Sequence, residues 1–201
     1  MLVSPLLAPL AWIEHGFGTR TTPLSQEGMA GLKQIHSALC RVAAAGCDPE
    51  GDALITDRAG LAISVRTADC YPILLADPAT RAVAAVHAGW RGTAAQVVHE
   101  TLARMQQEFG TQPADLYAAI GPGIGECCYE VGADVARQFG RSSAGHIDLA
   151  AANRRQLLDA GVVPERIDSL NLCTFCDPAQ FHSYRRDKTA GRMISYIRVR
   201  G

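Results

Sequence analysis

Residues 61–92, LAISVRTADCYPILLADPATRAVAAVHAGWRG, decide the fold because they hold two apolar segments joined by a turn. Asp77 and Pro78 match the first two positions of a type I turn, and Ile, Leu, Val and Ala dominate both flanks. This pattern predicts a β-hairpin. A symmetric turn places Cys70 opposite His87, with Cβ atoms roughly 5 Å apart. A thiolate and an imidazole at that separation can share one metal ion or one proton.

The register of this hairpin depends on the assumed symmetry of its turn. The symmetric turn also pairs Leu74 with Val83. A turn with an odd number of residues would shift the pairing by one. Pro72 has no N–H to donate to the ladder, so the pairing can also end before it reaches Cys70.

The chain has 201 residues, which is enough for one domain with a sizeable apolar core, and we expect a single domain over residues 1–201. Its 19 basic and 20 acidic residues give a net charge of −1. No global field therefore favours nucleic acid or an anionic membrane, and we expect neither as a partner. Recognition must depend on local groups, so the expected partner is a small-molecule substrate.

The amino-terminal segment, MLVSPLLAPLAWIEHGF, is apolar but has no basic region and is interrupted by Pro5 and Pro9. These features predict neither a signal peptide nor a membrane span. The seven cysteines are an odd number, which argues against a complete set of disulfides. Together the two observations predict reduced thiols and a cytoplasmic location.

A third candidate ligand precedes the hairpin. Lys33–His36, KQIH, is predicted to form a short strand that points Gln34 and His36 to one face. A lone histidine in such a strand is more often structural. If His36 meets Cys70 and His87, however, the three side chains match a catalytic zinc site, which has three protein ligands and one open position.

Two arginines are candidates for binding an anion. Arg20 follows a glycine-containing loop, HGFGTR, and can hold a phosphate or a carboxylate, or can simply be solvated. Arg91 precedes a predicted helix for which Thr93 is the N-cap and Gly110 the end. The positive end of that helix beside Arg91 predicts an anion pocket, unless GWRG only turns the chain and Trp90 packs in the core.

The helix that follows has an apolar stripe at helical spacing, formed by Val98, Leu102, Met105 and Phe109. Two later segments are predicted to border the site. Residues 121–125, GPGIG, form a tight loop, because Pro122 and the misplaced third glycine do not match a dinucleotide-binding motif. Tyr184 and Arg185 can offer stacking and anion contacts.

The remaining cysteines are predicted to be buried thiols. Cys40 and Cys47 lie in an alanine-rich segment and resemble small hydrophobic residues. Cys127 and Cys128 are adjacent, so a bridge between them would be strained. Residues 173–176, CTFC, could form a zinc knuckle or a redox pair, but a knuckle needs a second CxxC pair and the chain has none. Burial is therefore the preferred interpretation.

Several classes of function are compatible with these residues. A zinc enzyme would use His36, Cys70 and His87 to hold an ion that activates a water. A metal-free cysteine hydrolase or deamidase would use Cys70 as nucleophile and His87 as base. A multicopper oxidase needs roughly ten histidines plus a cysteine, and six histidines without an HxH pair are too few. A structural or binding role is the fourth possibility.

The motifs HGFGTR, KQIH, TADCYPILLADP, AVHAGWRG and SYRRD, in this order, closely resemble the YfiH or laccase-domain family, also labelled polyphenol oxidase. The resemblance extends over residues 12–197. It implies an α+β fold, a layered sandwich of mixed β-sheets flanked by helices, similar to cysteine hydrolases of the cytotoxic-necrotising-factor type. The zinc ligands of the family fall on His36, Cys70 and His87.

The resemblance implies a zinc-dependent purine nucleoside phosphorylase that also deaminates adenosine. Its substrates would be phosphate with adenosine, inosine or methylthioadenosine, and its products a free base and a sugar 1-phosphate. His36, Cys70 and His87 would form the catalytic centre. Editing of peptidoglycan precursors and metal-free cysteine hydrolysis are the alternatives, and copper-dependent oxidation is the least favoured, as is copper in place of zinc. We expect a monomer or a weak dimer.

Further residues are expected to bind the nucleoside or the phosphate, and these are Arg20, Arg91, Gln34, Tyr184 and Arg185. The chain departs from the expected family pattern at one position, where His182 replaces an aromatic residue before Ser183. This change would alter the wall of the pocket or add a proton carrier.

Overall fold

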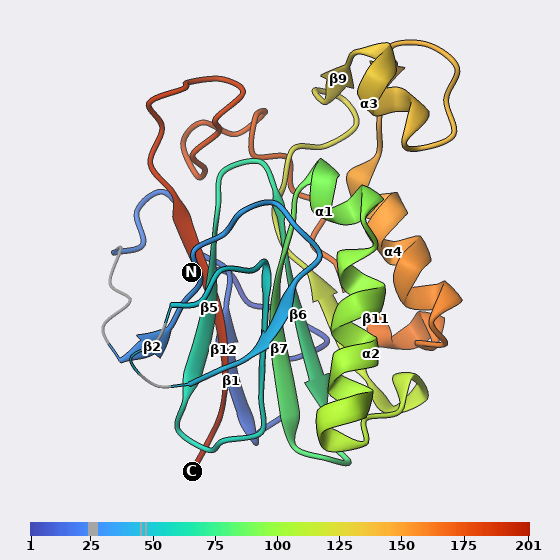
Figure 1. The fold of residues 1–201 in the computed structure, drawn as a ribbon. Helices are drawn as coiled ribbons and strands as arrows, with labels where there is room; N and C mark the ends of the chain where they lie inside the picture. The colour runs from blue at the N-terminus through green and yellow to red at the C-terminus, as the bar shows by residue number, and fades with distance from the viewer. Residues whose placement is uncertain (24–27, 45, 47) are drawn as a thin grey trace.

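The computed structural model describes residues 1–23, 28–44, 46 and 48–201, and these residues form three layers (Figure 1). The strands are β1 (Ile13–Gly16), β2 (Met29–Ala30), β3 (Cys40–Val42), β4 (Ala53–Thr56), β5 (Ala62–Thr67), β6 (Tyr71–Asp77), β7 (Ala82–Ala88), β8 (Tyr117–Ile120), β9 (Glu130–Val131), β10 (Gly145–His146), β11 (Ile167–Ser169) and β12 (Met193–Val199). The helices are α1 (Trp90–Ala94), α2 (Val97–Phe109), α3 (Ala133–Arg137) and α4 (Leu149–Asp159), with single 3-10 turns η1 (Pro113–Asp115) and η2 (Pro164–Arg166).

A six-stranded sheet forms the middle layer, in the order β11-β8-β6-β7-β4-β3. Helices α2 and α4 cover one of its faces, and the four-stranded sheet β1-β12-β5-β2 packs on the other (Figure 1). Both sheets combine antiparallel with parallel pairs. In the six-stranded sheet β6 pairs antiparallel with β7 and β3 parallel with β4, and in the four-stranded sheet β5 pairs antiparallel with β12 and parallel with β2. The predicted α+β class, with mixed sheets flanked by helices, is therefore confirmed.

The central hairpin of β6 and β7 is buried on both faces. Ile73 and Leu75 point into the core beneath the helices, whereas Leu74 and Ala76 point into the core between the two sheets. Every residue of both strands is buried. This double coverage explains why the sequence is continuously apolar here instead of alternating between apolar and polar residues.

The predicted hairpin is present, but its predicted register is wrong by two residues. Leu74 pairs with Ala85 instead of Val83, and His87 lies opposite Pro72 instead of Cys70. The loop is longer than a symmetric two-residue turn, because Arg81 adopts a left-handed conformation (φ 59°) before the second strand begins. A shift of two residues preserves the face of each side chain, so Cys70 and His87 stay on the same side.

The predicted helix after the hairpin is divided in two. Thr93 is not an N-cap, because it lies buried within α1 and its hydroxyl donates to Oδ1 of Asn153 at 3.2 Å. Gln96 adopts a left-handed conformation (φ 64°) that separates α1 from α2. The end of α2 at Gly110 (φ 76°) is as predicted. The structure buries three members of the predicted apolar stripe, Val98, Leu102 and Met105.

Lys33–His36 is not a strand, contrary to the prediction. Lys33 makes one isolated parallel bridge with Glu50, and the backbone then curls so that His36 has a φ of 58°. Cys40 packs against the helix-side core, as predicted, whereas Cys47 lies outside the described residues. No helix in the described part of the chain is long and apolar enough to cross a membrane.

Candidate active site

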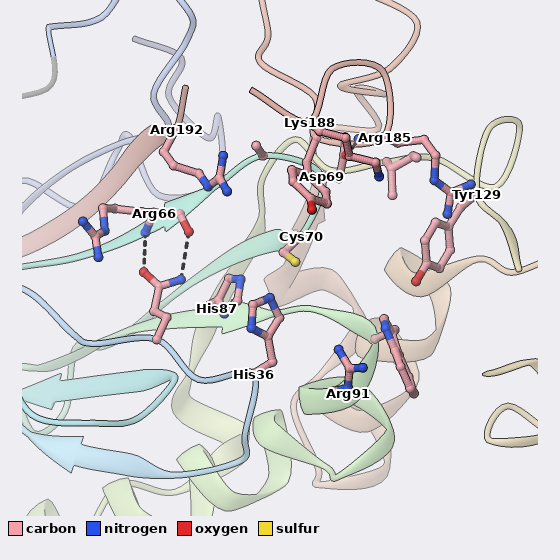
Figure 2. A pocket seen from close by; sticks show the side chains of 15 residues that line it. His36, Arg66, Asp69, Cys70, His87, Arg91, Tyr129, Arg185, Lys188 and Arg192 are labelled. Atoms are coloured by element: carbon pink, nitrogen blue, oxygen red, sulfur yellow. Dashed lines mark hydrogen bonds between the residues drawn. The ribbon is translucent and has the colours of Figure 1, made fainter. Parts of the chain in front are cut away.

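Three side chains from separate segments converge at one end of the central hairpin. His36 comes from the curled loop, Cys70 directly precedes β6, and His87 lies in β7 (Figure 2). Their potential ligand atoms all lie within 4.8 Å of one another. The two imidazole rings are 4.9 Å apart, centroid to centroid, and nearly perpendicular. Exposure increases from His87, which is buried, through Cys70 to His36, so the cluster opens toward solvent.

One buried carboxylate holds this cluster in place. Asp52 is fully buried and accepts hydrogen bonds from the backbone N–H of His36 (3.0 Å) and Ser37 (2.5 Å). It also accepts one from the Ser37 hydroxyl (2.7 Å) and one from Nδ1 of His87 (2.8 Å). Nδ1 of His87 faces Asp52, so Nε2 is the ring nitrogen that faces Cys70.

Sequence analysis missed Asp52. The signal available was a carboxylate placed directly before an apolar strand, in GDALIT, where it cannot remain solvated. The bonds from His36 and Ser37 also explain the curl of the loop, because these backbone amides point at a carboxylate instead of a neighbouring strand.

The electrostatics of the cluster favour a thiolate. Burial alone would raise the pKa of Cys70, but hydrogen bonds from His36 and His87 lower this pKa to about 6. Burial would lower the pKa of His87, but hydrogen bonds with Asp52 and Cys70 raise this pKa to about 9. Burial acts to raise the pKa of Asp52 as well, yet His87 and Ser37 hold it at about 2. The thiolate is the form of cysteine that binds metals and attacks electrophiles.

Gly89 makes room for the cluster. A Cβ atom at this position would lie 2.8 Å from Sγ of Cys70 and 3.2 Å from Cδ2 of His36. The backbone of Gly89 (φ −82°, ψ 169°) is accessible to any residue, so the position requires glycine for space and not for conformation. Gly89 of the motif AGWRG therefore lets the backbone pass close to Sγ of Cys70.

A pocket of about 800 Å³ opens onto the three side chains. Five cationic side chains line it, namely Arg66, Arg91, Arg185, Lys188 and Arg192. Its one carboxylate, Asp69, already accepts hydrogen bonds from the Thr174 hydroxyl and the backbone N–H of Arg185, each at 2.7 Å. None of the five cations forms an ion pair with a carboxylate within the described residues. The pocket is therefore positive and suited to an anion.

Aromatic rings form other parts of the pocket wall, and three of them stack with cations. The guanidinium carbon of Arg91 lies 4.5 Å from the centroid of the Trp90 ring. Arg185 lies 5.2 Å from the centroid of Tyr129, and Nζ of Lys188 lies 4.2 Å from that of Tyr184. Flat apolar surfaces beside fixed cations suit a planar ring attached to an anionic or polar group.

The structure brings Arg91, Tyr184 and Arg185 to this pocket. Gln34 also reaches the wall, but its amide is paired with the backbone of Arg66, by a donated and an accepted bond of 2.8 Å each (Figure 2). It therefore positions Arg66. Arg20 does not line the pocket, because its guanidinium donates to the carbonyl of Pro178 at 3.0 Å.

Sequence analysis missed three cations of the pocket. Arg66 is the one exposed residue of the otherwise buried strand β5, and a charged residue in the apolar run AISVRT was the available signal. Lys188 and Arg192 flank the turn after SYRRD and reach the pocket only because that loop folds back over it. Their sequence, DKTAGR, is that of an ordinary solvated turn.

Known proteins of similar sequence and structure agree with this architecture. The chain is 40% identical over 163 residues to a purine nucleoside phosphorylase of Bacteroides thetaiotaomicron, which is 74% of this chain and 60% of that protein. It is 41% identical over 183 residues to one of Deinococcus radiodurans, with 85% and 70% covered. It thus spans about two thirds of their length.

The crystal structure of YlmD from Geobacillus stearothermophilus superimposes with a TM-score of 0.89 at 29% identity, covering 96% of this chain and 94% of that chain. This similarity independently supports the layered α+β fold. The family model described as multi-copper polyphenol oxidoreductase laccase matches residues 18–200. This chain is therefore a member of that laccase-domain family, as the resemblance of its motifs predicted.

Proposed function

We propose that the protein is a zinc-dependent purine nucleoside phosphorylase that also deaminates adenosine. Phosphorolysis needs a site for an anion and a site for a planar base, next to a group that stabilises developing charge. The observation that carries the proposal is that five cations and three aromatic rings border the cluster of His36, Cys70 and His87. The relatives named purine nucleoside phosphorylases support it.

The donor set of the cluster fits zinc. One thiolate and two imidazoles with an open fourth position match catalytic zinc sites. Copper sites of the same donor set add a long axial bond, usually to methionine, and no methionine is among the described residues that line the pocket. His36, Cys70 and His87 would hold the ion. When bound, it would supply Lewis acidity at the open position.

The protein's own residues would bind and orient the two substrates. Arg66, Lys188 and Arg192, together with Arg91, would hold phosphate so that one of its oxygens attacks the anomeric carbon of the sugar. The carbon–nitrogen bond breaks, its electron pair leaves with the base, and the base takes up the proton that hydrogen phosphate loses. The ring of Trp90 or Tyr129 would stack on the base.

Deamination of adenosine would use the same orientation of the base. A water adds at C6 and ammonia leaves, so this reaction needs no phosphate. The substrates adenosine, inosine and methylthioadenosine share the purine ring and the ribosyl carbon that is attacked. Since the cations are needed only for phosphate, we expect the two activities to depend on different parts of the pocket.

Incubation of the purified protein with adenosine tests the proposal. With phosphate we expect adenine and ribose 1-phosphate, together with inosine and hypoxanthine from deamination, and without phosphate we expect inosine alone. Both activities should disappear when the metal at His36, Cys70 and His87 is removed by a chelator and return with zinc. If neither adenine nor inosine forms while that site holds zinc, the proposed function is wrong.

The substitution Arg91→Gln is expected to separate the two activities. It should raise KM for phosphate about tenfold or more, because a charge-assisted hydrogen bond contributes about 1.5–3 kcal/mol. The rate of deamination should change much less. Steady-state kinetics with varied phosphate measure the effect. Arg155→Gln is the matched control, because Arg155 lies exposed on α4 and pairs with Asp159. An unchanged KM for phosphate would remove Arg91 from the phosphate site.

A metal-free cysteine hydrolase or deamidase is the second candidate. It is favoured by one observation, the chain of contacts from Cys70 through His87 to Asp52, which resembles a cysteine–histidine–carboxylate triad. Metal removal distinguishes the two proposals. A hydrolase of this kind would gain activity on removal of metal and lose it on alkylation of Cys70, whereas the phosphorylase would lose activity in both treatments.

A further inference from the structure

A second group of four cysteines gathers away from Cys70. The Sγ atoms of Cys127, Cys128, Cys173 and Cys176 all lie within 4.8 Å of one another. Cys176 is 3.6 Å from Cys127 and 3.3 Å from Cys128, sulfur to sulfur. Cys127 and Cys176 are exposed, so the prediction of four buried thiols is wrong. The CxxC pair has a partner after all, and it is the adjacent pair Cys127 and Cys128.

The backbone brings the two pairs together. Gly123 and Cys173 form a parallel bridge, in which the N–H of Gly123 donates to Leu172 (3.2 Å) and the N–H of Thr174 donates to Gly123 (2.9 Å). The N–H of Gly125 then donates to Sγ of Cys173 at 3.3 Å. Hydrogen bonds from backbone amides to sulfur stabilise the thiolate form, which is the form that binds metals.

Glycine at position 125 fits the same close approach, because a larger residue would be tightly packed there. A Cβ atom there would lie 3.3 Å from Sγ of Cys127 and 3.3 Å from Cβ of Cys173. The sulfur separations match a shared ion better than they match two bridges. A disulfide joins sulfurs at about 2.05 Å, whereas four sulfurs at about 2.3 Å from one zinc ion lie about 3.8 Å apart.

The grouping of the four cysteines also fits one bound ion better than two disulfide bonds. Each of the four sulfurs lies within 4.8 Å of the other three, so they do not divide into two separate pairs, and a bridge within the adjacent pair Cys127 and Cys128 would be strained. Four thiolates around a divalent cation leave a net negative charge, and a cation lies next to the CxxC segment. The guanidinium of Arg186 donates to the carbonyls of Thr174 (2.9 Å) and Phe175 (2.8 Å).

We propose that Cys127, Cys128, Cys173 and Cys176 bind one Zn²⁺ as a tetrathiolate structural site, separate from the site at Cys70. The thiols release their protons to solvent as the four zinc–sulfur bonds form, and no sulfur is oxidised. Four thiolates and no open position are typical of structural zinc, whose binding free energy adds to the free energy of unfolding.

The proposed ion would secure one wall of the substrate pocket. Thr174, between the two cysteines of the CxxC pair, donates to Asp69, and the backbone N–H of Ile124 donates to the Asp69 carbonyl at 2.8 Å. Tyr129 follows Cys128 directly and lines the pocket. The tetrathiolate site therefore ties together the segments that border Cys70 without contributing a ligand to it. Loss of the ion should lower Tm and raise KM for the substrates, and its effect on kcat should be small.

Metal analysis of the purified protein tests this proposal independently of any activity. We expect about two zinc ions per chain in the wild type and about one in Cys176→Ser and in Cys70→Ala. Cys40→Ala is the matched control, because Cys40 belongs to neither cluster, and it should keep both ions. If Cys176→Ser contains as much zinc as the wild type, the proposal is wrong.

Cobalt provides a second measurement that does not require Cys176→Ser to fold. Cys70→Ala protein, depleted of metal under reducing conditions and refilled with Co²⁺, should show the intense thiolate-to-metal absorption and ligand-field bands of a tetrahedral tetrathiolate centre. Absence of these bands would overturn the proposal, as would iron at this site in place of zinc.

Titration of thiols in the denatured wild-type protein should find these four cysteines reduced. Disulfide bonds among them would also contradict the proposal.

Discussion

Replacing Cys70 with alanine is expected to lower kcat/KM for phosphorolysis of adenosine about a thousandfold or more. This factor corresponds to about 4 kcal/mol of transition-state stabilisation, which is within the range that a catalytic metal supplies. The variant should also lose the zinc ion held with His36 and His87. The fold should persist, because Cys70 precedes β6 and contributes nothing to the hairpin ladder.

Two comparisons separate this effect from a general loss of structure. Cys40→Ala removes a thiol that burial keeps protonated, since burial raises the pKa of Cys40 to about 12, and it should leave turnover unchanged. Circular dichroism and Tm show whether each variant is folded. Full turnover and full zinc content in a folded Cys70→Ala protein would remove Cys70 from the active site.

The substitution Asp52→Asn is expected to have the second large effect. It should weaken zinc binding about 10- to 100-fold, the usual result of losing a carboxylate that orients a metal-bound histidine. Asparagine can donate to Nδ1 of His87, which would leave the proton on Nε2, where the lone pair is needed. The amides of His36 and Ser37 would also lose their anionic acceptor.

The same substitution should destabilise the protein by about 3–5 kcal/mol, because it removes one partner of a buried charged pair. Competition with a chelator measures the zinc affinity, and denaturant titration measures the free energy of unfolding. Asp159→Asn is the control, since Asp159 is exposed and pairs with Arg155 on the surface of α4. Wild-type zinc affinity in Asp52→Asn would show that Asp52 does not orient His87.

Acid should lower the unfolding free energy of the wild type through protonation of Asp52, an effect that Asp52→Asn lacks. The pKa of Asp52 is lowered from 3.8 to about 2 in the folded protein. A carboxyl group with a lowered pKa stabilises the fold fully above its unfolded value, and this contribution disappears as the pH falls toward 2. The difference in unfolding free energy between wild type and Asp52→Asn should therefore shrink between about pH 4 and pH 2.

Local sequence rules were sufficient to predict the hairpin and to single out the three side chains that meet at its end. The Asp77–Pro78 turn and the continuous apolar flanks predicted β6 and β7. The register was wrong because it depends on the left-handed conformation of Arg81, which no sequence rule assigns to an arginine. Cys70 and His87 still meet despite this error, because an even shift leaves them on one face.

Contacts between distant segments could not be predicted in the same way. The curl of residues 35–37 depends on a carboxylate about fifteen positions away in the chain, and the tetrathiolate cluster depends on pairs separated by nearly fifty. In both cases the local pattern is ambiguous, and the tertiary fold selects the outcome. Arg66, Lys188 and Arg192 were missed for the same reason.

The double coverage of the central hairpin has a consequence for how the active site responds to its substrates. Any widening between β6 and β7 would open two apolar cores at once, so His87, which lies within β7, is held firmly in place. His36, Lys188 and Arg192 instead arrive on loops. An anion that enters the pocket can therefore displace these loop residues while His87 stays fixed in the hairpin.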